Sequence, residues 1–408
     1  MKMLLIVPRC NFLVSDRVMP PLGAMTIKAA ATEHHIDICD DDSYLEKAPN
    51  YDIIGVSCTT PQYKSAIEIA KSIKNKVNIK IVIGGPHTTH NHNDIDQIFD
   101  YVFVGDSELT INQFLNSPTD RIVFGKKIHT GDWGNIPVTW RDKKFLAKYN
   151  YNIKDVPATT MITGKDCPMG CGFCEHAKSG ISLKPLSIIN QELADINDCG
   201  YRSIMFYDDI FAINKQRVFD LCSIIKPYNF IFRCFVHAST FDDEMAKTLY
   251  DAGCRIICWG AESCDERILK NVGKSIRPDD NYRVARTILN NNMDAVAFCM
   301  IGLPGEDYRS ISATEDFIAS FSTANRFSFD YTIFYPYKGT YIWQHRDQFD
   351  IKIDNHDTIG YYKGLHGESE CCISTSTLSS DDIIRERHRI CSNIISVVSH
   401  TVLRNLST

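Results

Sequence analysis

The chain has 408 residues, of which 44% are hydrophobic and 23% charged, and its formal net charge is −6. This length suits two or three globular domains, and the composition is that of an ordinary folded protein. A negative net charge gives no overall attraction to nucleic acid or to an anionic membrane. The apolar run from Met3 to Val7 is too short for a signal peptide, and no stretch approaches the ~18 apolar residues of a membrane span. We expect a cytoplasmic protein without a membrane span that binds no nucleic acid.

Residues 1 to 110 alternate strand-like and helix-like segments, which is typical of a parallel sheet. The expected strands are MLLIVP, IDICD, DIIGVSC, IKIVIGG and YVFVGD, and the expected helices are PPLGAMTIKAAATEH and YKSAIEIAKSIKNK. This pattern predicts a doubly wound, Rossmann-like domain. In such a sheet the ligand lies at the carboxyl ends of the strands. The loops at 59–61, 84–87 and 105–108 form that edge.

Residues 115 to 155 show weak periodicity, and we interpret them as a linker and an entry strand. Strand and helix then alternate again, with strands expected at ATTMIT, SIMFYDD, FIFRCFV, RIICWGAES, AVAFCMIG and FSFDYTIFY. Six such units predict a curved, barrel-like α/β sheet with its site at the carboxyl ends of the strands. IIRERHRICSNIISVVSH predicts a terminal helix.

The loop KDCPMGCGFCEH places Cys167, Cys171 and Cys174 within eight positions. A structural zinc site needs four ligands, and His176 would be a crowded fourth. Three thiolates on a four-iron cluster leave one iron without a protein ligand, and that iron can bind a substrate or cofactor. The spacing favours a cluster with a chemical role, while zinc or chance remains the alternative. Cys258 lies within an apolar strand and is interpreted as a core residue.

The Cys-x3-Cys-x2-Cys spacing, with Phe173 before the last cysteine, resembles the signature of radical S-adenosylmethionine (radical SAM) enzymes. The downstream segments FYDDIFAIN, GAES, MIGLPGE and FYPYKGT resemble the later motifs of that family in the same order. In the N-terminal half, PPLG, GVSCTTPQ, GGPH and GDSE resemble the cobalamin-binding domain that is fused to one branch of it.

The resemblance implies a cobalamin-binding domain over 1–135, a partial (β/α)6 TIM-barrel radical SAM core over 136–345, and a small, mainly helical C-terminal region over 346–408. It implies that three cysteines hold a 4Fe-4S cluster: Cys167, Cys171 and Cys174. The expected contacts to S-adenosylmethionine are Phe173, Asp208, Asp209, Glu262, Ser263 and Gly302. The expected contacts to cobalamin are Thr59, Thr60, Gly84, Gly85, His87, Gly105 and Glu108.

The chain departs from the family pattern at three places. It has no Asp-x-His-x-x-Gly motif to place a histidine on cobalt, Lys165-Asp166 precedes the first cysteine of the loop, and His237 lies where many relatives have an arginine. A cobalt without a histidine ligand is therefore expected. The cofactor carboxylate also lacks that arginine as a partner.

Three functions are compatible with these motifs. The first is a cobalamin-dependent methyltransferase acting on an unactivated carbon or phosphinate, and the second is an oxidative cyclase or rearrangement enzyme of the same branch. The third is a non-enzymatic iron–sulfur or zinc protein, against which the downstream motifs argue. A small-molecule or peptide substrate and a reductant such as flavodoxin or ferredoxin are the expected partners. The sequence identifies no catalytic residue.

Overall fold

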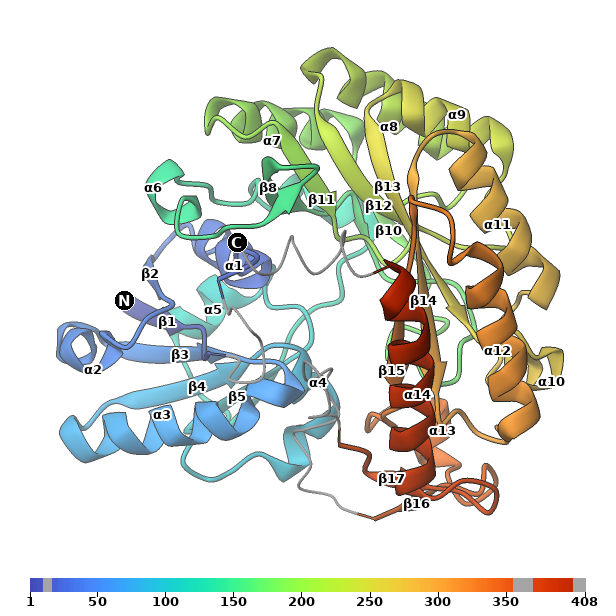
Figure 1. The fold of residues 1–408 in the computed structure, drawn as a ribbon. Coiled ribbons are helices and arrows are strands. Elements are labelled where there is room, and N and C mark those ends of the chain that lie inside the picture. The colour runs from blue at the N-terminus through green and yellow to red at the C-terminus, as the bar shows by residue number, and fades with distance from the viewer. Residues whose placement is uncertain (10–16, 355–369, 399–408) are drawn as a thin grey trace. The chain divides into compact units, whose positions relative to one another are not determined.

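Two parallel sheets organise the chain (Figure 1). The computed structural model describes residues 1–9, 17–354 and 370–398. It divides the chain into two units, one made of Met1–Tyr149 with Ser187–Asp195, and the other of Asn150–Leu186 with the chain from Ile196 onwards. The three-part division at residues 135 and 345 stays a prediction. Within the described residues no helix has the length and apolar character needed to cross a membrane.

The first unit is built on a six-stranded parallel sheet with the order β2-β1-β3-β4-β5-β6. The strands are β1 (Lys2–Ile6), β2 (His35–Cys39), β3 (Ile53–Ser57), β4 (Lys80–Gly84), β5 (Tyr101–Val104) and β6 (Ile122–Phe124). The α-helices are α1 (Leu22–Ala30), α2 (Tyr44–Lys47), α3 (Tyr63–Lys76), α4 (Pro86–Asn91), α5 (Ile111–Asn116) and α6 (Lys143–Leu146). The expected doubly wound fold is confirmed. The linker interpretation of residues 115 to 155 was wrong at Ile122–Phe124, which pairs in parallel with β5.

Apolar residues cover both faces of this sheet. Leu4 and Ile54 belong to a core cluster that includes Ala66 and Ile73 of α3, whereas Met3 and Phe103 belong to a separate cluster with Ala24 of α1. Successive strand residues point to opposite faces, so each strand contributes to both clusters. This explains why the strands read as nearly continuous apolar runs.

The second unit is built on a seven-stranded sheet with the order β15-β14-β13-β12-β11-β8-β7, parallel except for β7. Its strands are β7 (Asn152–Ile153), β8 (Val156–Met161), β11 (Ser203–Phe206), β12 (Ile231–Val236), β13 (Cys254–Glu262), β14 (Asp294–Ile301) and β15 (Phe327–Ile333). Two short ribbons add β9 (Gly164–Lys165) with β10 (Ser182–Leu183), and β16 (Lys352–Ile353) with β17 (Ile373–Ser374). The six parallel strands are the six expected from the sequence, and they form a half-barrel.

Helices follow the strands of this half-barrel, and Figure 1 shows α8, α9, α11 and α12 along one side of its sheet. The helices of this unit are α8 (Lys215–Ile225), α9 (Asp243–Asp251), α10 (Glu266–Asn271), α11 (Pro278–Asn290), α12 (Tyr308–Phe321), α13 (Tyr341–Gln344) and α14 (Ser380–Val398). Helix α7 (Leu186–Asp198) precedes β11 in the sequence, and its residues Ser187–Asp195 belong to the first unit. Asn214, Asp242 and Asp307 cap α8, α9 and α12 by accepting backbone N–H bonds, which fixes where each helix begins. The expected C-terminal helix is confirmed as α14.

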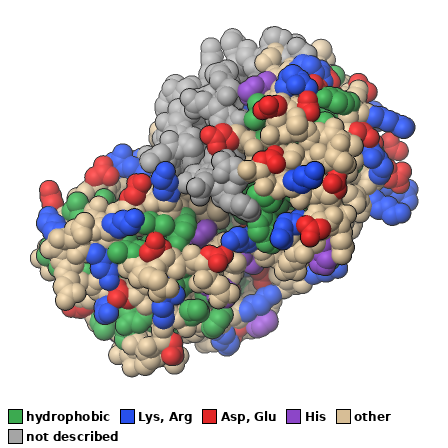
Figure 2. All heavy atoms as spheres, turned by 90° about the horizontal axis from the view of Figure 1, so that it is seen from below, with side chains coloured by type: hydrophobic (Ala, Val, Ile, Leu, Met, Phe, Trp, Pro, Cys, Tyr) green, Lys and Arg blue, Asp and Glu red, His purple; other side chains and the backbone are tan. Residues whose placement is uncertain are grey.

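The surface carries both signs of charge. Figure 2 shows Lys and Arg side chains interspersed with Asp and Glu over the face that it draws. A mixed surface of this kind agrees with the net charge of −6.

Candidate functional site

The three cysteines lie on the loop that follows β8, at the carboxyl edge of the half-barrel. The ribbon of β9 and β10 closes the base of this loop. Ser179 ties its two ends together, because its hydroxyl accepts from Cys167 N–H at 3.1 Å and donates to the His176 carbonyl at 2.7 Å. Hydrogen bonds within the protein therefore hold the loop in one shape.

A second set of contacts fixes the loop to the turn after α10. Gly172 N–H donates to the Val272 carbonyl at 2.7 Å, and Ile342 N–H donates to the Gly172 carbonyl at 2.9 Å. Gly273 has φ +69°, and a Cβ there would lie 2.7 Å from the Gly170 carbonyl oxygen. Only glycine fits this position without moving the loop.

The thiols of Cys167, Cys171 and Cys174 lie on one loop, and the Cys171 charge acts on both of the others. Burial raises the pKa of all three, and for Cys174 to about 12, with further increases from the charges of Cys171, Asp209 and Cys167. Three thiolates this close repel one another and need a cation between them. Iron is such a cation, so this donor set fits a cluster held by three thiolates.

In the described ranges no three His, Cys, Asp or Glu side chains converge on a point where a single metal ion would bind. A mononuclear site brings all its ligands to within about 2.3 Å of one ion. A four-iron cluster has each cysteine on a different iron, and its ligands are therefore spread more widely. A donor set of three thiols on one loop fits the larger group, in which the fourth iron needs no protein ligand.

Glu262 and Lys274 form a buried ion pair beside the cysteine loop. Lys274 Nζ lies 2.8 Å from Glu262 Oε1, and the two side chains are only 7% and 10% exposed. Burial opposes the charge on Lys274, but Glu262 and the thiols of Cys171 and Cys174 raise its pKa overall. A Cβ on Gly260 would overlap the Glu262 carboxylate, which explains the glycine in GAES.

Sequence reasoning missed Lys274. It is a lone lysine in NVGKS, and lysine is rarely buried unless it is paired. The local signal was Gly273, whose positive φ places the following residue against the cysteine loop. Glu262 itself has φ +58°, an uncommon conformation for a residue with a side chain.

The two expected aspartates occupy different environments. Asp208 is buried and accepts from both N–H and Oγ of Thr163, at 2.9 and 2.6 Å, and burial raises its pKa to about 6. Asp209 is 36% exposed, and its Oδ2 lies 3.1 Å from Nδ1 of His176. Asp209 also raises the pKa of Cys167 and Cys174. Of the two, Asp209 is the one beside the cysteine loop.

Ser263 and Gly302 have partners inside the fold. Ser263 is fully buried, its hydroxyl is 3.4 Å from Thr314 Oγ1, and it accepts from Asp265 N–H. A Cβ at Gly302 would lie 3.1 Å from Ile383 of α14. Gly302 also has φ +85°, a backbone conformation that favours glycine. Phe173 is partly buried within the cysteine loop.

His237 directly follows β12 and is 5% exposed. Its Nδ1 lies 2.7 Å from Ser239 Oγ and accepts from Ser239 N–H at 3.3 Å, so the ring proton belongs on Nε2. Burial and the nearby Lys274 charge lower the pKa of His237 to about 4. Nε2 has no hydrogen-bond partner within the described residues, leaving a neutral donor at the carboxyl edge of the half-barrel.

The first unit presents its own ligand edge between β1 and β3, where the strand order reverses. Gln62 connects the loops after these strands, donating to the Pro8 carbonyl at 2.6 Å and accepting from Thr59 N–H at 2.9 Å. A Cβ on Gly85 would clash with the Cys58 carbonyl at 2.7 Å, whereas one on Gly105 would meet nothing within 4 Å. This edge combines tight backbone packing with open space.

His87 lies at the same edge and is 7% exposed. Its ring stacks on Tyr63 with centroids 4.1 Å apart, and its Nδ1 is 3.2 Å from Thr60 Oγ1. Thr59 is exposed, Thr60, Gly84 and Glu108 are partly buried, and all lie at the ends of β3, β4 and β5. A large planar ligand would meet small residues and backbone here.

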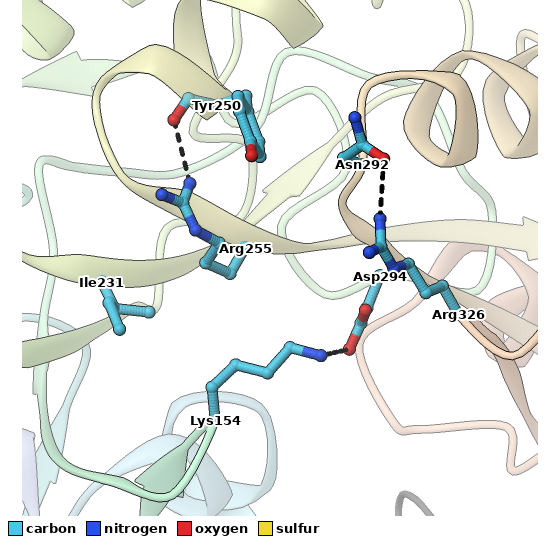
Figure 3. A pocket seen from close by; sticks show the side chains of 7 residues that line it. All are labelled: Lys154, Ile231, Tyr250, Arg255, Asn292, Asp294 and Arg326. Carbon is cyan, nitrogen blue, oxygen red and sulfur yellow. Dashed lines mark hydrogen bonds and ion pairs between the residues drawn. The ribbon is translucent and has the colours of Figure 1, made fainter.

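A separate hollow of about 460 Å³ lies at the amino ends of the half-barrel strands (Figure 3). Figure 3 shows Lys154 directed at Asp294 and Arg326 at Asn292. Arg255 donates to the Tyr250 carbonyl at 2.9 Å. The charged groups of this hollow are thus largely engaged with one another, at the strand ends opposite to the cysteine loop.

Comparisons with known proteins match both halves of the chain. Residues 8–115 match the model of the B12 binding domain, and residues 161–318 match that of the radical SAM superfamily. The uncharacterised methyltransferase PH0819 of Pyrococcus horikoshii is 28% identical over 392 residues, covering 85% of this chain and 83% of that protein. The bacteriochlorophyllide d C-12(1)-methyltransferase of Chlorobaculum tepidum is 23% identical, over 87% of this chain and 80% of that protein.

The fold resembles that of TsrM from Kitasatospora setae, a radical S-adenosylmethionine methyltransferase solved with cobalamin and a [4Fe-4S] cluster. The TM-score is 0.75 at 14% identity, over 97% of this chain and 89% of TsrM. The two matched domain models occur in the same order as the two sheets described above. The chain therefore belongs to the family of radical S-adenosylmethionine enzymes that carry a cobalamin-binding domain.

Proposed function

We propose that the protein is a cobalamin-dependent radical SAM methyltransferase that methylates an unactivated carbon or phosphorus position. Both curated relatives described above are named methyltransferases, and the fold matches that of TsrM, another methyltransferase. The single observation that carries the proposal is that Cys167, Cys171 and Cys174, spaced Cys-x3-Cys-x2-Cys, lie beside the buried Glu262–Lys274 pair.

In this proposal the three cysteines hold a 4Fe-4S cluster. When bound, such a cluster with one open iron supplies the electron that cleaves S-adenosylmethionine to a 5′-deoxyadenosyl radical. Lys274 offsets negative charge next to the thiolates, because its ammonium is in electrostatic range of Cys171 and Cys174. The carbonyls of Val272 and Gly172 bond to the loop and to α13, so the loop keeps its shape during binding.

The residues proposed to bind S-adenosylmethionine are those facing the cysteine loop. Glu262 offers an acceptor for ribose hydroxyls, Asp209 an acceptor for the amino group, and Lys274 a cation for the carboxylate. Phe173 lies within the loop itself. Asp208, Ser263 and Gly302 support the site from inside the fold. They hold the neighbouring strand ends in place through contacts to Thr163, Thr314 and Ile383, respectively.

Cobalamin is proposed to bind at the carboxyl edge of the first sheet. Small residues permit close approach of a corrin ring there, and His87 is stacked on Tyr63. The residues proposed to line this site are Thr59, Thr60, Gly84, Gly85, His87, Gly105 and Glu108. A flavodoxin- or ferredoxin-type reductant and a small-molecule or peptide substrate complete the proposal.

Anaerobic reconstitution with iron, sulfide, hydroxocobalamin and methyl-deuterated S-adenosylmethionine tests the function. Under dithionite we expect 5′-deoxyadenosine, and we expect the deuterated methyl group on the protein-bound cobalamin by mass spectrometry. Formation of 5′-deoxyadenosine with no methyl group on cobalt would favour an oxidative cyclase or rearrangement enzyme instead. Absence of both products would contradict the radical mechanism.

A further inference from the structure

Strand β12 presents two different faces. Phe232, Cys234 and Val236 are buried, whereas Arg233 and Phe235 are only partly buried. The buried set faces the helices: Cys234 Sγ lies 4.0 Å from Cys254 Sγ, and Cys254 in turn raises the pKa of Cys222 in α8. Because alternate residues of a strand point to opposite sides, Arg233 and Phe235 face the inner side of the half-barrel.

Arg233 has hydrogen-bond partners but, among the described residues, no counterion. Its Nε donates to Cys258 Sγ at 3.0 Å, and its Nη1 donates to Tyr151 OH at 3.2 Å. Burial raises the pKa of both partners, so both are neutral at physiological pH. In the described part of the chain no Asp or Glu forms an ion pair with Arg233.

An unpaired guanidinium in this position is costly for the fold. Arginine does not lose its proton in proteins, and removing a cation from water is unfavourable unless an anion accompanies it. Asp330 is the inward-facing carboxylate of β15, opposite Phe298 of β14. It is three strand spacings from β12, about 14 Å, too far to neutralise Arg233 by direct contact. The described residues therefore supply no anion to Arg233.

Aromatic side chains lie next to the guanidinium on the same inner face. The rings of Phe235 and Phe298 have centroids 5.9 Å apart at 32°, and the Arg233 guanidinium is 5.9 Å from the Phe235 ring. Tyr207 is 49% exposed, and yet burial raises the pKa of its hydroxyl, on which the Arg233 charge also acts. The Tyr207 hydroxyl is therefore within electrostatic range of Arg233.

The inward-facing residues of β12 differ in chemical type along the strand. Arg233, Phe235 and His237 follow one another toward the carboxyl edge, where the cysteine loop lies. Four residues of extended strand place Arg233 about 13 Å below His237. A ligand along this line meets a cation at its deep end, aromatic rings at its middle and the neutral His237 donor near the cysteines.

We propose that the substrate is an organic anion with an aromatic or extended apolar body, and that Arg233 binds its carboxylate or phosphate. Phe235 and Phe298 contact the body, and the reacting position lies toward the cysteine loop. This inference rests on the proposed function, because it takes the anion bound on the inner face of the half-barrel to be the substrate of that reaction.

Calorimetric titration of the full-length chain with ω-phenylalkanoates of two to five carbons tests the charge requirement. Each acid is compared with its primary amide, which has the same shape without the charge, and 3-phenylpropyl phosphate tests the phosphate alternative. We expect at least one anion to bind 10-fold or more tightly than its neutral counterpart. The tighter of the matched carboxylate and phosphate identifies the anionic group. Equal affinity of every acid and its amide would overturn the proposal.

Variants at Arg233 localise the effect. Arg233→Met should abolish the preference for the acid, and Arg233→Lys should restore part of it. Arg233→Gln, which keeps a hydrogen-bond donor, decides the question if the methionine variant does not fold. Arg255→Met, which removes a cation of the hollow in Figure 3, should leave the preference unchanged. A preference that survives both neutral Arg233 substitutions would contradict the assignment.

This titration needs neither cluster nor S-adenosylmethionine cleavage. A chain that forms 5′-deoxyadenosine and methylated cobalamin but shows no acid preference would refute the substrate class alone. A chain with the acid preference but no radical chemistry would refute the proposed function and leave Arg233 as an anion-binding residue.

Discussion

Lys274 Nζ lies 2.8 Å from Glu262 Oε1, joining the turn after α10 to the end of β13. Both side chains are buried, and the pair lies against a loop of three thiols that is itself bonded to the same turn through Gly172 and Val272. The Lys274 ammonium thus interacts with the Glu262 carboxylate on one side and with the cysteine sulfurs on the other. The stability of the fold and the charge balance of the site depend on the same lysine.

Glu262→Gln should destabilise the protein by about 3 kcal/mol, because it leaves the Lys274 ammonium buried without its anion. Urea unfolding measures the loss. Adding Lys274→Met should recover most of it, since the double variant contains no unpaired charge. Glu266→Gln, four residues further along and exposed, is the matched control and should change stability by under about 0.5 kcal/mol. A loss for Glu262→Gln no larger than that of the control would contradict a structural role for the pair.

Replacing Cys167, Cys171 and Cys174 together by alanine should remove the brown colour near ~400 nm expected of thiolate-bound iron. Iron and sulfide analysis after anaerobic reconstitution measures the loss. Cys254→Ala is the control, because Cys254 is fully buried in β13 and should retain the full iron content. Four irons retained by the triple variant would show that the cluster is bound elsewhere.

Glu306 should make stability fall as pH rises. Burial raises its pKa to about 8, against the backbone N–H bonds of Gly302 and Leu303, which lower it. Between its unfolded value of 4.5 and about 8 the folded state holds a proton that the unfolded chain has lost. Its contribution is therefore complete below pH 4.5 and is lost through pH 8, at about 1.4 kcal/mol per pH unit.

Glu306→Gln isolates this effect, because glutamine resembles the protonated acid and does not titrate. Urea unfolding of both proteins from pH 5 to pH 8.5 should show the wild type losing stability relative to the variant. Other titrating groups are common to both proteins and cancel in the difference. A constant difference across this range would show that Glu306 does not change its protonation there.

Protein reconstituted with hydroxocobalamin and reduced to cobalt(II) should give a base-off electron paramagnetic resonance spectrum without nitrogen superhyperfine splitting. The chain has no Asp-x-His-x-x-Gly motif, and the histidine at the ligand edge, His87, is already stacked on Tyr63 and near Thr60. His87→Phe keeps the stacked ring and should give the same spectrum. Splitting in the wild type that disappears in His87→Phe would identify His87 as a cobalt ligand.

The alternation of strand-like and helix-like segments predicted both sheets, and strands buried on two faces were visible as long apolar runs. Ile122–Phe124 escaped prediction because three residues at the edge of a sheet are too few to show a pattern. The six strands of the half-barrel were all expected, and the cysteine spacing identified the loop that the structure places at their carboxyl edge.

The finer geometry around Glu262 depends on contacts that sequence does not record. The pairing of β13 with β14 shifts between Gly260 and Glu262, and Glu262 has a positive φ. Simple alternation fails there, so Glu262 turns toward Lys274 while Ser263 turns into the core at Thr314. Lys274 lies twelve positions after Glu262, and no repeating pattern in the sequence marks it as buried.

The close approach of Gly170 and Gly273 gives the cysteine loop a built-in reporter. Gly172 N–H is bonded across to the Val272 carbonyl, and an amide held in this way exchanges with deuterium only when the loop separates from the turn after α10. The exchange rate of that one amide therefore measures how often the loop opens, in a chain with or without iron. The assembly of the proposed iron–sulfur site can thus be followed on the backbone, independently of colour and of turnover.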